Sequence, residues 1–222
     1  MTDTLQAYLQ PTYFIDSDSP EIVEYGLELT KSEKTDLKKA VRLYYAVRDG
    51  FRYDPYKIDL DRKAFRASSV LKKGYGFCIN KAVLLTAAAR SAGIPARLGF
   101  ADVKNHLTSK KLTELMQTDE FLYHGYSELF LDHKWVKATP AFNLRLCRRF
   151  NVKPLEFDGT TDSVFHEYDT NGNRHMEYIR EHGSFADLPY DRIYSAYRKH
   201  YPLLFSMKSG FVETDFELDA EK

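Results

Sequence analysis

Cys78 and His124 are of the residue types that thiol nucleophilic chemistry requires. Cys78 follows the glycine-bearing loop Lys73-Gly74-Tyr75-Gly76-Phe77 and opens a helix that we predict over residues 78–92. A helix N-terminus stabilises a thiolate through its free N–H groups and its dipole. A thiol nucleophile also needs a base, and His124 begins a predicted strand that lies beside Cys78 if the helix packs on the sheet. Taken singly, a buried free cysteine and a structural histidine are the more common readings.

Four further residues are candidates for the oxyanion site or the cleft around Cys78. The backbone N–H groups near Phe77 are placed to hold an oxyanion. Tyr53 or Tyr75 could donate a phenol O–H to the same oxygen, although with sixteen tyrosines in the chain packing is the more ordinary role for either. Asp102 lies at the end of a predicted strand and could reach the cleft rim, and the alternative is an ordinary role at the strand end.

The sequence gives little sign of a metal or cofactor site. His175-Met176-Glu177 pairs two potential ligands, but a metal centre needs more ligands at fixed geometry. The chain has neither a phosphate-binding nor a dinucleotide-binding glycine signature. We therefore expect no metal and no organic cofactor.

The elements that must position Cys78 and His124 follow from hydrophobic periodicity. We predict helices over residues 20–30 and 36–49, with Gly50 as a left-handed cap, and a buried helix over 78–92. Alternating residues predict a strand over 96–103 and a hairpin formed by 121–131 and 135–139. Residues 140–222 are less regular, with one predicted helix at 190–200. The fold class is therefore α+β.

Composition bounds the class of protein. The 222 residues carry 32 Lys+Arg and 32 Asp+Glu, and 43% are hydrophobic, as expected for one globular domain. The zero net charge argues against a general nucleic-acid binder. The absence of a long apolar run or a signal-like N-terminus predicts no membrane association. Two distant cysteines predict no disulfide framework, so we expect a cytoplasmic location and leave the oligomeric state open.

Two linked motifs resemble the transglutaminase-like superfamily, in particular its bacterial-type cysteine peptidases. The first motif has a cysteine that opens a helix, and the helix ends in Gly-Ile-Pro-Ala-Arg at residues 93–97 before a strand. The second is a histidine strand, with His124, Glu128 and Trp135 at the family's spacing. The resemblance covers roughly residues 37–143.

This resemblance implies a papain-related core in which the cysteine helix packs on an antiparallel sheet. It divides a single domain, residues 1–222, into a helical lead-in at 1–36, a core at about 37–143 and an extension at 144–222. It implies that Cys78 is the nucleophile and His124 the base of an acyl transfer through a thioester. The substrate would be a peptide or an amide-containing small molecule with an amide or ester bond, and no cofactor would be needed.

The sequence departs from the family at the third catalytic residue, usually an Asp on the strand after the histidine. One alignment places Lys137 there and another places Thr139, and neither is a carboxylate. Asn143 could orient His124 through its amide oxygen, as in Cys-His-Asn sites, and Asp102 is another candidate. The missing Asp keeps open a weak or inactive enzyme that serves as a binding module. We also expect the extension to cap the cleft and influence specificity.

Overall fold

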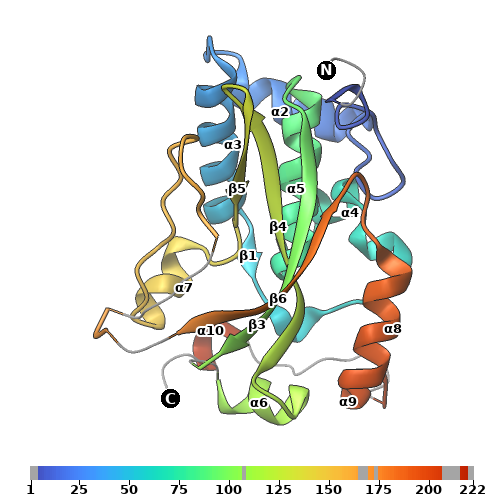
Figure 1. The fold of residues 1–222 in the computed structure, drawn as a ribbon, viewed down its shortest axis with the longest axis vertical. Coiled ribbons are helices and arrows are strands. Elements are labelled where there is room, and N and C mark those ends of the chain that lie inside the picture. The colour runs from blue at the N-terminus through green and yellow to red at the C-terminus, as the bar shows by residue number, and fades with distance from the viewer. Residues whose placement is uncertain (1–4, 107–108, 165–169, 173–174, 207–215, 220–222) are drawn as a thin grey trace.

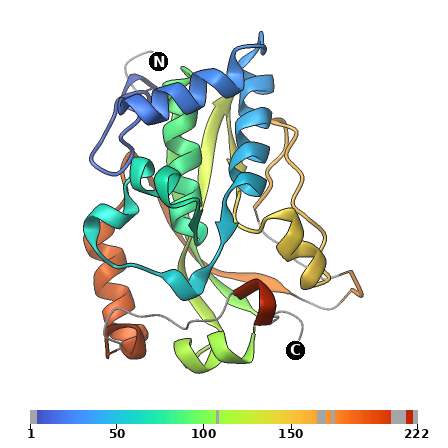
Figure 2. The same cartoon turned by 180° about the vertical axis from the view of Figure 1, so that it is seen from behind.

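A computed structural model describes residues 5–106, 109–164, 170–172, 175–206 and 216–219. The fold is α+β, as predicted. Its centre is a four-stranded antiparallel sheet in the order β5-β4-β3-β6, formed by β3 (Ala96–Asn105), β4 (Glu120–Leu131), β5 (Lys134–Ala138) and β6 (Met176–Phe185). The helices of the N-terminal half cover one face of this sheet, as the two opposite views show (Figures 1 and 2).

The central helix α5 (Cys78–Ser91) confirms the buried helix predicted from its apolar composition. It packs against β4 and β3 on one side and against α2 (Pro20–Thr30), α3 (Asp36–Gly50) and α4 (Ala67–Lys73) on the other. Because it is enclosed on all sides, it needs apolar residues around its whole circumference. Every residue from Cys78 to Arg90 is buried.

Two buried cations on α5 tie the surrounding chain to it. The Lys81 ammonium donates to the carbonyl oxygens of Arg48, Phe51 and Ala141 at 2.7–2.8 Å. Arg90 donates to the carbonyl oxygens of Gln10, Ala96 and Ala186. Every nitrogen of the two side-chain head groups thus has at least one acceptor inside the protein, and these bonds link the lead-in and the later chain to the central helix.

Strand β4 approaches α5 closely at Gly125. A Cβ atom at this position would lie only 3.1 Å from the Ile79 Cα, so the glycine lets the helix N-terminus rest on the strand. Two residues further, the Ser127 hydroxyl donates to the Ala82 carbonyl and fixes the helix along the strand. The register pairs Ala101 of β3 with His124. The sequence therefore brings the Cys78 end of the helix to the His124 end of the strand.

Several short elements complete the N-terminal half. β1 (Arg52–Tyr53) pairs in parallel with β2 (Tyr75–Gly76). β2 lies in the loop that leads into Cys78. The segment between β1 and α4 contains two 3₁₀ turns, η1 (Pro55–Lys57) and η2 (Arg62–Phe65). The prediction that Gly50 is a left-handed cap was wrong, because Gly50 is the last residue of α3 and Phe51 turns directly into extended backbone.

The region after residue 140 is more regular than its sequence indicates. The helix predicted at 190–200 is confirmed as α8 (Tyr190–His200), but β6 was missed and is an integral strand of the sheet beside β3. Figure 1 shows α8 flanking the lower part of the sheet. The remaining helices are α6 (Lys110–Met116), α7 (Leu144–Arg149), α9 (Pro202–Ser206) and α10 (Phe216–Asp219).

Candidate active site

Cys78 and His124 line the same small cavity. Cys78 is the first residue of α5 and His124 lies on β4, and the cavity between them has a volume of about 30 Å³. Its other walls are apolar or aromatic and come from the segment before α4, from Phe77, from α6, from the start of β4 and from the end of α8. These residues are Pro55, Ile58, Phe77, Leu112, Met116, Phe121, Leu122, Tyr197 and Tyr201.

Backbone N–H groups surround the Cys78 sulfur. The N–H groups of Gly125, Ile79 and Cys78 itself interact with the sulfur and favour its anion. Burial acts in the opposite direction and is stronger, so the pKa of the Cys78 thiol is raised to about 11. The thiol is therefore protonated at neutral pH, while the groups that would stabilise a developing negative charge are already in place.

The His124 imidazole is neutral in the resting protein. It is 5% exposed, and burial together with the nearby His175 lowers its pKa to about 4. Its ring makes no hydrogen bond within the part of the chain that the structure describes. A neutral imidazole can accept a proton, so His124 has the charge state that a general base requires.

The Asn143 side chain makes hydrogen bonds away from His124. Its Oδ1 accepts from the Tyr53 backbone N–H at 3.2 Å, and its Nδ2 donates to Glu217 Oε1 at 3.0 Å. Asn143 therefore ties β1, which lies directly beside the cysteine loop, to the C-terminal helix α10.

The other candidates for the third residue also have different partners. The Thr139 hydroxyl donates to the Val164 carbonyl, and Lys137 pairs with Glu181 at 2.9 Å. Asp102 lies within β3 rather than in a strand-end loop. Its Oδ1 accepts from the Tyr123 N–H at 2.9 Å and lies 2.7 Å from His182 Nε2.

The predicted oxyanion and cleft residues separate into two groups. Phe77 lines the cavity, and Tyr53 is close enough to Cys78 for a charge on the sulfur to raise the pKa of its phenol. Tyr75 lies outside the cavity, with Lys57 Nζ 4.9 Å from its ring centroid. Gly76, between Tyr75 and Phe77, has no room for a side chain, because a Cβ would lie 2.6 Å from the Asn80 Cβ.

Sequence reasoning missed three residues of this site. Tyr197 reaches the cavity from α8 and Tyr201 from the position directly after this helix, and fully buried His175 lies near His124. The Tyr201 hydroxyl donates to the Glu120 carbonyl and accepts from the Leu122 N–H. These two bonds link Tyr201 to the beginning of β4. For Tyr197, the sequence signal is its spacing from Ile193 on one face of the predicted helix. This spacing indicates that the side chain is buried, but it does not indicate which part of the protein it packs against.

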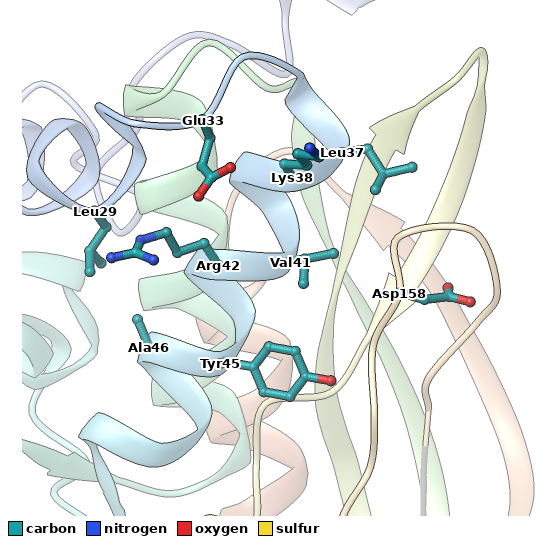
Figure 3. Close-up of a pocket in the computed structure, with 9 residues that line it drawn as sticks. All are labelled: Leu29, Glu33, Leu37, Lys38, Val41, Arg42, Tyr45, Ala46 and Asp158. Carbon is teal, nitrogen blue, oxygen red and sulfur yellow. The ribbon is translucent and has the colours of Figure 1, made fainter.

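A larger cavity of about 720 Å³ lies elsewhere, on the α2–α3 side of the molecule (Figure 3). Its walls include Leu29, Leu37, Val41 and Tyr45, and Asp158 lies on the opposite loop. The lining contains neither a cysteine nor a histidine, so the residues with catalytic potential lie at the smaller cavity.

Within the part of the chain that the structure describes, no group of three or more His, Cys, Asp or Glu side chains is arranged to hold a metal ion. Among the same residues, no helix is both long enough and apolar enough to cross a membrane.

Comparisons with known proteins agree with this architecture. Residues 23–140 match the transglutaminase-like superfamily core, so the chain belongs to the transglutaminase-like superfamily. No curated protein sequence matches it. The family assignment covers the predicted cysteine and histidine motifs, because both Cys78 and His124 lie within the matched residues.

One of two similar solved structures supports the fold. The chain is similar to a "Putative Cysteine Protease from Cytophaga hutchinsonii", with a TM-score of 0.51 and 13% identity over 83% of this chain and 55% of that one. A "putative protease from Parabacteroides distasonis" gives a TM-score of 0.40 and 19% identity over 61% of this chain and 25% of that one. The chain thus spans about half the length of the first of these proteins and a quarter of the second.

Proposed function

We propose that this protein is a cysteine-dependent acyl-transfer enzyme that acts on amide or ester bonds, with Cys78 as nucleophile and His124 as base. The observation that carries the proposal is the shared cavity, which brings a helix-N-terminal thiol and a neutral imidazole to one small apolar site. The family membership supports it, as does the similarity to the putative cysteine protease from Cytophaga hutchinsonii. The substrate class is a peptide or an amide-containing small molecule.

The reaction follows from the resting charge states. The Cys78 sulfur forms a bond to the substrate carbonyl carbon while His124 takes the thiol proton, and the carbonyl π electrons move onto oxygen. The oxyanion then collapses to a thioester, the bond to the leaving amine or alcohol breaks, and His124 returns the proton to that group. Attack by water on the thioester gives hydrolysis, and attack by an amine gives transfer.

The backbone around Cys78 supports the charged stage of this reaction. The same N–H groups that favour a thiolate lie beside the position where the oxyanion develops. Because the neutral thiol and neutral imidazole are the stable resting forms, proton transfer accompanies attack instead of preceding it. The two free cysteines are consistent with a reducing, cytoplasmic compartment as the place of action.

Acylation of Cys78 by p-nitrophenyl acetate tests the proposal. The acetyl group is small and uncharged, so it suits a small cavity with mostly apolar walls. We expect intact-protein mass spectrometry to show one acetyl group, mapped to Cys78, that is released over time by water or an added amine. Cys78→Ala should abolish the adduct. Cys147→Ser is the matched control, since Cys147 is also a buried cysteine that forms no disulfide but lies outside the cavity. Labelling at Cys147 alone would contradict the proposal.

The second candidate is a binding module that retains the fold and has lost the reaction. It is favoured by the missing Asp: the two residues that can be aligned with it are Lys137, which pairs with Glu181, and Thr139, whose hydroxyl donates to the Val164 carbonyl. Such a protein would show no acyl adduct on Cys78 with p-nitrophenyl acetate or with simple peptide esters. The enzyme proposal predicts the adduct, so the same experiment separates the two functions.

A further inference from the structure

Tyr197 is a buried tyrosine of the cavity whose hydroxyl the fold does not use. It is 5% exposed and lies near the C-terminal end of α8. Its hydroxyl makes no hydrogen bond with any residue that the structure describes. The Tyr197 oxygen is not among the completely enclosed polar atoms without a partner, so it remains accessible and can donate a hydrogen bond to a ligand oxygen in the cavity.

The neighbouring Tyr201 shows the contrast. Its ring packs edge-on against that of Tyr197 with 5.2 Å between centroids, so the two rings form one wall of the cavity. The Tyr201 hydroxyl is bonded to two backbone groups of β4, at 2.6 Å and 2.9 Å. Tyr201 is therefore anchored to the backbone of β4 and holds the Tyr197 ring in place by packing against it. The Tyr197 hydroxyl has no such bond to a described residue.

The Tyr197 phenol is also close to the reacting sulfur. A charge on Cys78 acts on Tyr197, and this effect adds to burial in raising the phenol pKa well above 10. The phenol therefore stays protonated and remains a donor throughout the accessible pH range. The other polar side chains of the cavity are Cys78, His124 and Tyr201. Cys78 is the proposed nucleophile, His124 is the proposed base, and the Tyr201 hydroxyl is bonded to the backbone.

We propose that Tyr197 is a further catalytic residue, which donates a hydrogen bond from its hydroxyl to the oxyanion formed on the Cys78 adduct. This inference rests on the proposed acyl transfer. It gives α8, a part of the C-terminal extension, a direct part in the reaction. The Tyr197 hydroxyl keeps its proton in this step, and the negative charge is shared between its O–H and the backbone N–H groups beside Cys78.

The Tyr197→Phe variant tests the proposal, because it removes one oxygen and no hydrogen bond between described residues. We expect the rate constant for acetylation of Cys78 by p-nitrophenyl acetate to fall by about 10- to 100-fold, with the apparent KM little changed. The thermal unfolding midpoint should stay the same or rise slightly. Tyr194→Phe is the matched control on the same helix. Its ring packs on Tyr190 and Phe205, and it lies outside the cavity.

A second measurement separates this proposal from the proposed function. Butyraldehyde adds reversibly to a thiol and gives an adduct with an oxygen at the oxyanion position, so its affinity reports the donor without turnover. We expect Tyr197→Phe to bind it about tenfold more weakly than the wild type and Tyr194→Phe to bind it equally well. Equal acetylation rates and equal aldehyde affinities in wild type and Tyr197→Phe would overturn the role of Tyr197. Failure of the wild type to form any Cys78 adduct would overturn the proposed function itself.

Discussion

Gly125 rests directly against Ile79, at the point where the histidine strand meets the cysteine helix. An added Cβ at Gly125 would come within 3.1 Å of the Ile79 Cα and 3.4 Å of its backbone nitrogen. Since Cys78 precedes Ile79 and His124 precedes Gly125, this contact sets the separation of the two candidate catalytic residues. The glycine is thus a requirement of the site as well as of the fold.

Gly125→Ala should move the helix N-terminus away from β4. The backbone of Ile79 cannot yield as a flexible side chain would, so we expect a loss of about 1–3 kcal/mol in the free energy of unfolding. Acetylation of Cys78 should fall by at least about tenfold, because small displacements of reacting groups are costly. Gly50→Ala is the control, since nothing lies within 4 Å of its added Cβ. Equal acetylation rates in both variants would show that the close contact does not position the pair.

His124 should make the protein sensitive to acid. Its pKa is about 4 in the folded protein and about 6.5 when unfolded, so between these values the unfolded chain binds a proton that the folded chain does not. Stability should therefore fall as the pH falls from 6.5 to 4, by up to ~3 kcal/mol from this group. Urea unfolding of wild type and His124→Gln at several pH values measures the difference.

The expected result is a shallower decline in stability for His124→Gln over this pH range. The exposed His200 supplies the control, and His200→Gln should keep the wild-type slope. A slope that is identical in all three proteins would mean that His124 titrates like an exposed histidine.

Lys81 should be important for stability because its ammonium joins the end of α3 and the segment after β5 to α5. Replacing it with methionine leaves the carbonyls of Arg48, Phe51 and Ala141 without this donor, and we expect a loss of about 2–4 kcal/mol. Lys31→Met is the control, because Lys31 is exposed and pairs with Glu28 at the surface, where such pairs contribute about 0–1 kcal/mol. Denaturant unfolding gives both values, and similar losses would contradict the role of Lys81.

Asn143 should act on the site through Tyr53 and Glu217. We expect Asn143→Ala and Glu217→Ala each to lower stability by about 1–3 kcal/mol, and the double variant to lose less than the sum, because they share one hydrogen bond. A double-mutant cycle by thermal or urea unfolding measures this coupling. If Asn143→Ala kept full stability but lost acetylation activity, Asn143 would instead act directly on His124.

The elements that hold Cys78 and His124 could be predicted because their sequences carry strong local signals. Helix α5 is rich in Ala and Leu and is followed closely by Gly93, and β4 is rich in aromatic and aliphatic residues before a tight turn at Asp132 and His133. Strand β6 lacks such a signal. Its residues Glu177, Arg180 and Glu181 interrupt the apolar pattern, and its pairing with β3 is broken by two register shifts.

The contribution of α8 to the site could not be predicted for a different reason. The approach of Tyr197 to Cys78 depends on how a helix 119 residues later packs across the start of β4, which no local pattern encodes. The partners of Asn143 and Asp102 are similarly distant in sequence, at Glu217 and His182. Residue type indicated that these side chains could take part in hydrogen bonding, and only the fold shows with which groups.

The most direct test of the central claim is the rate constant for acetylation of Cys78, measured from pH 4 to 9 in wild type and His124→Ala. The proposed pair predicts that His124→Ala reacts about 10²–10⁴-fold more slowly at pH 7, as expected for loss of a general base. It also predicts that the wild-type rate declines only as the pH approaches 4, where His124 becomes protonated. Equal rates in the two proteins across this range would contradict a Cys78–His124 pair.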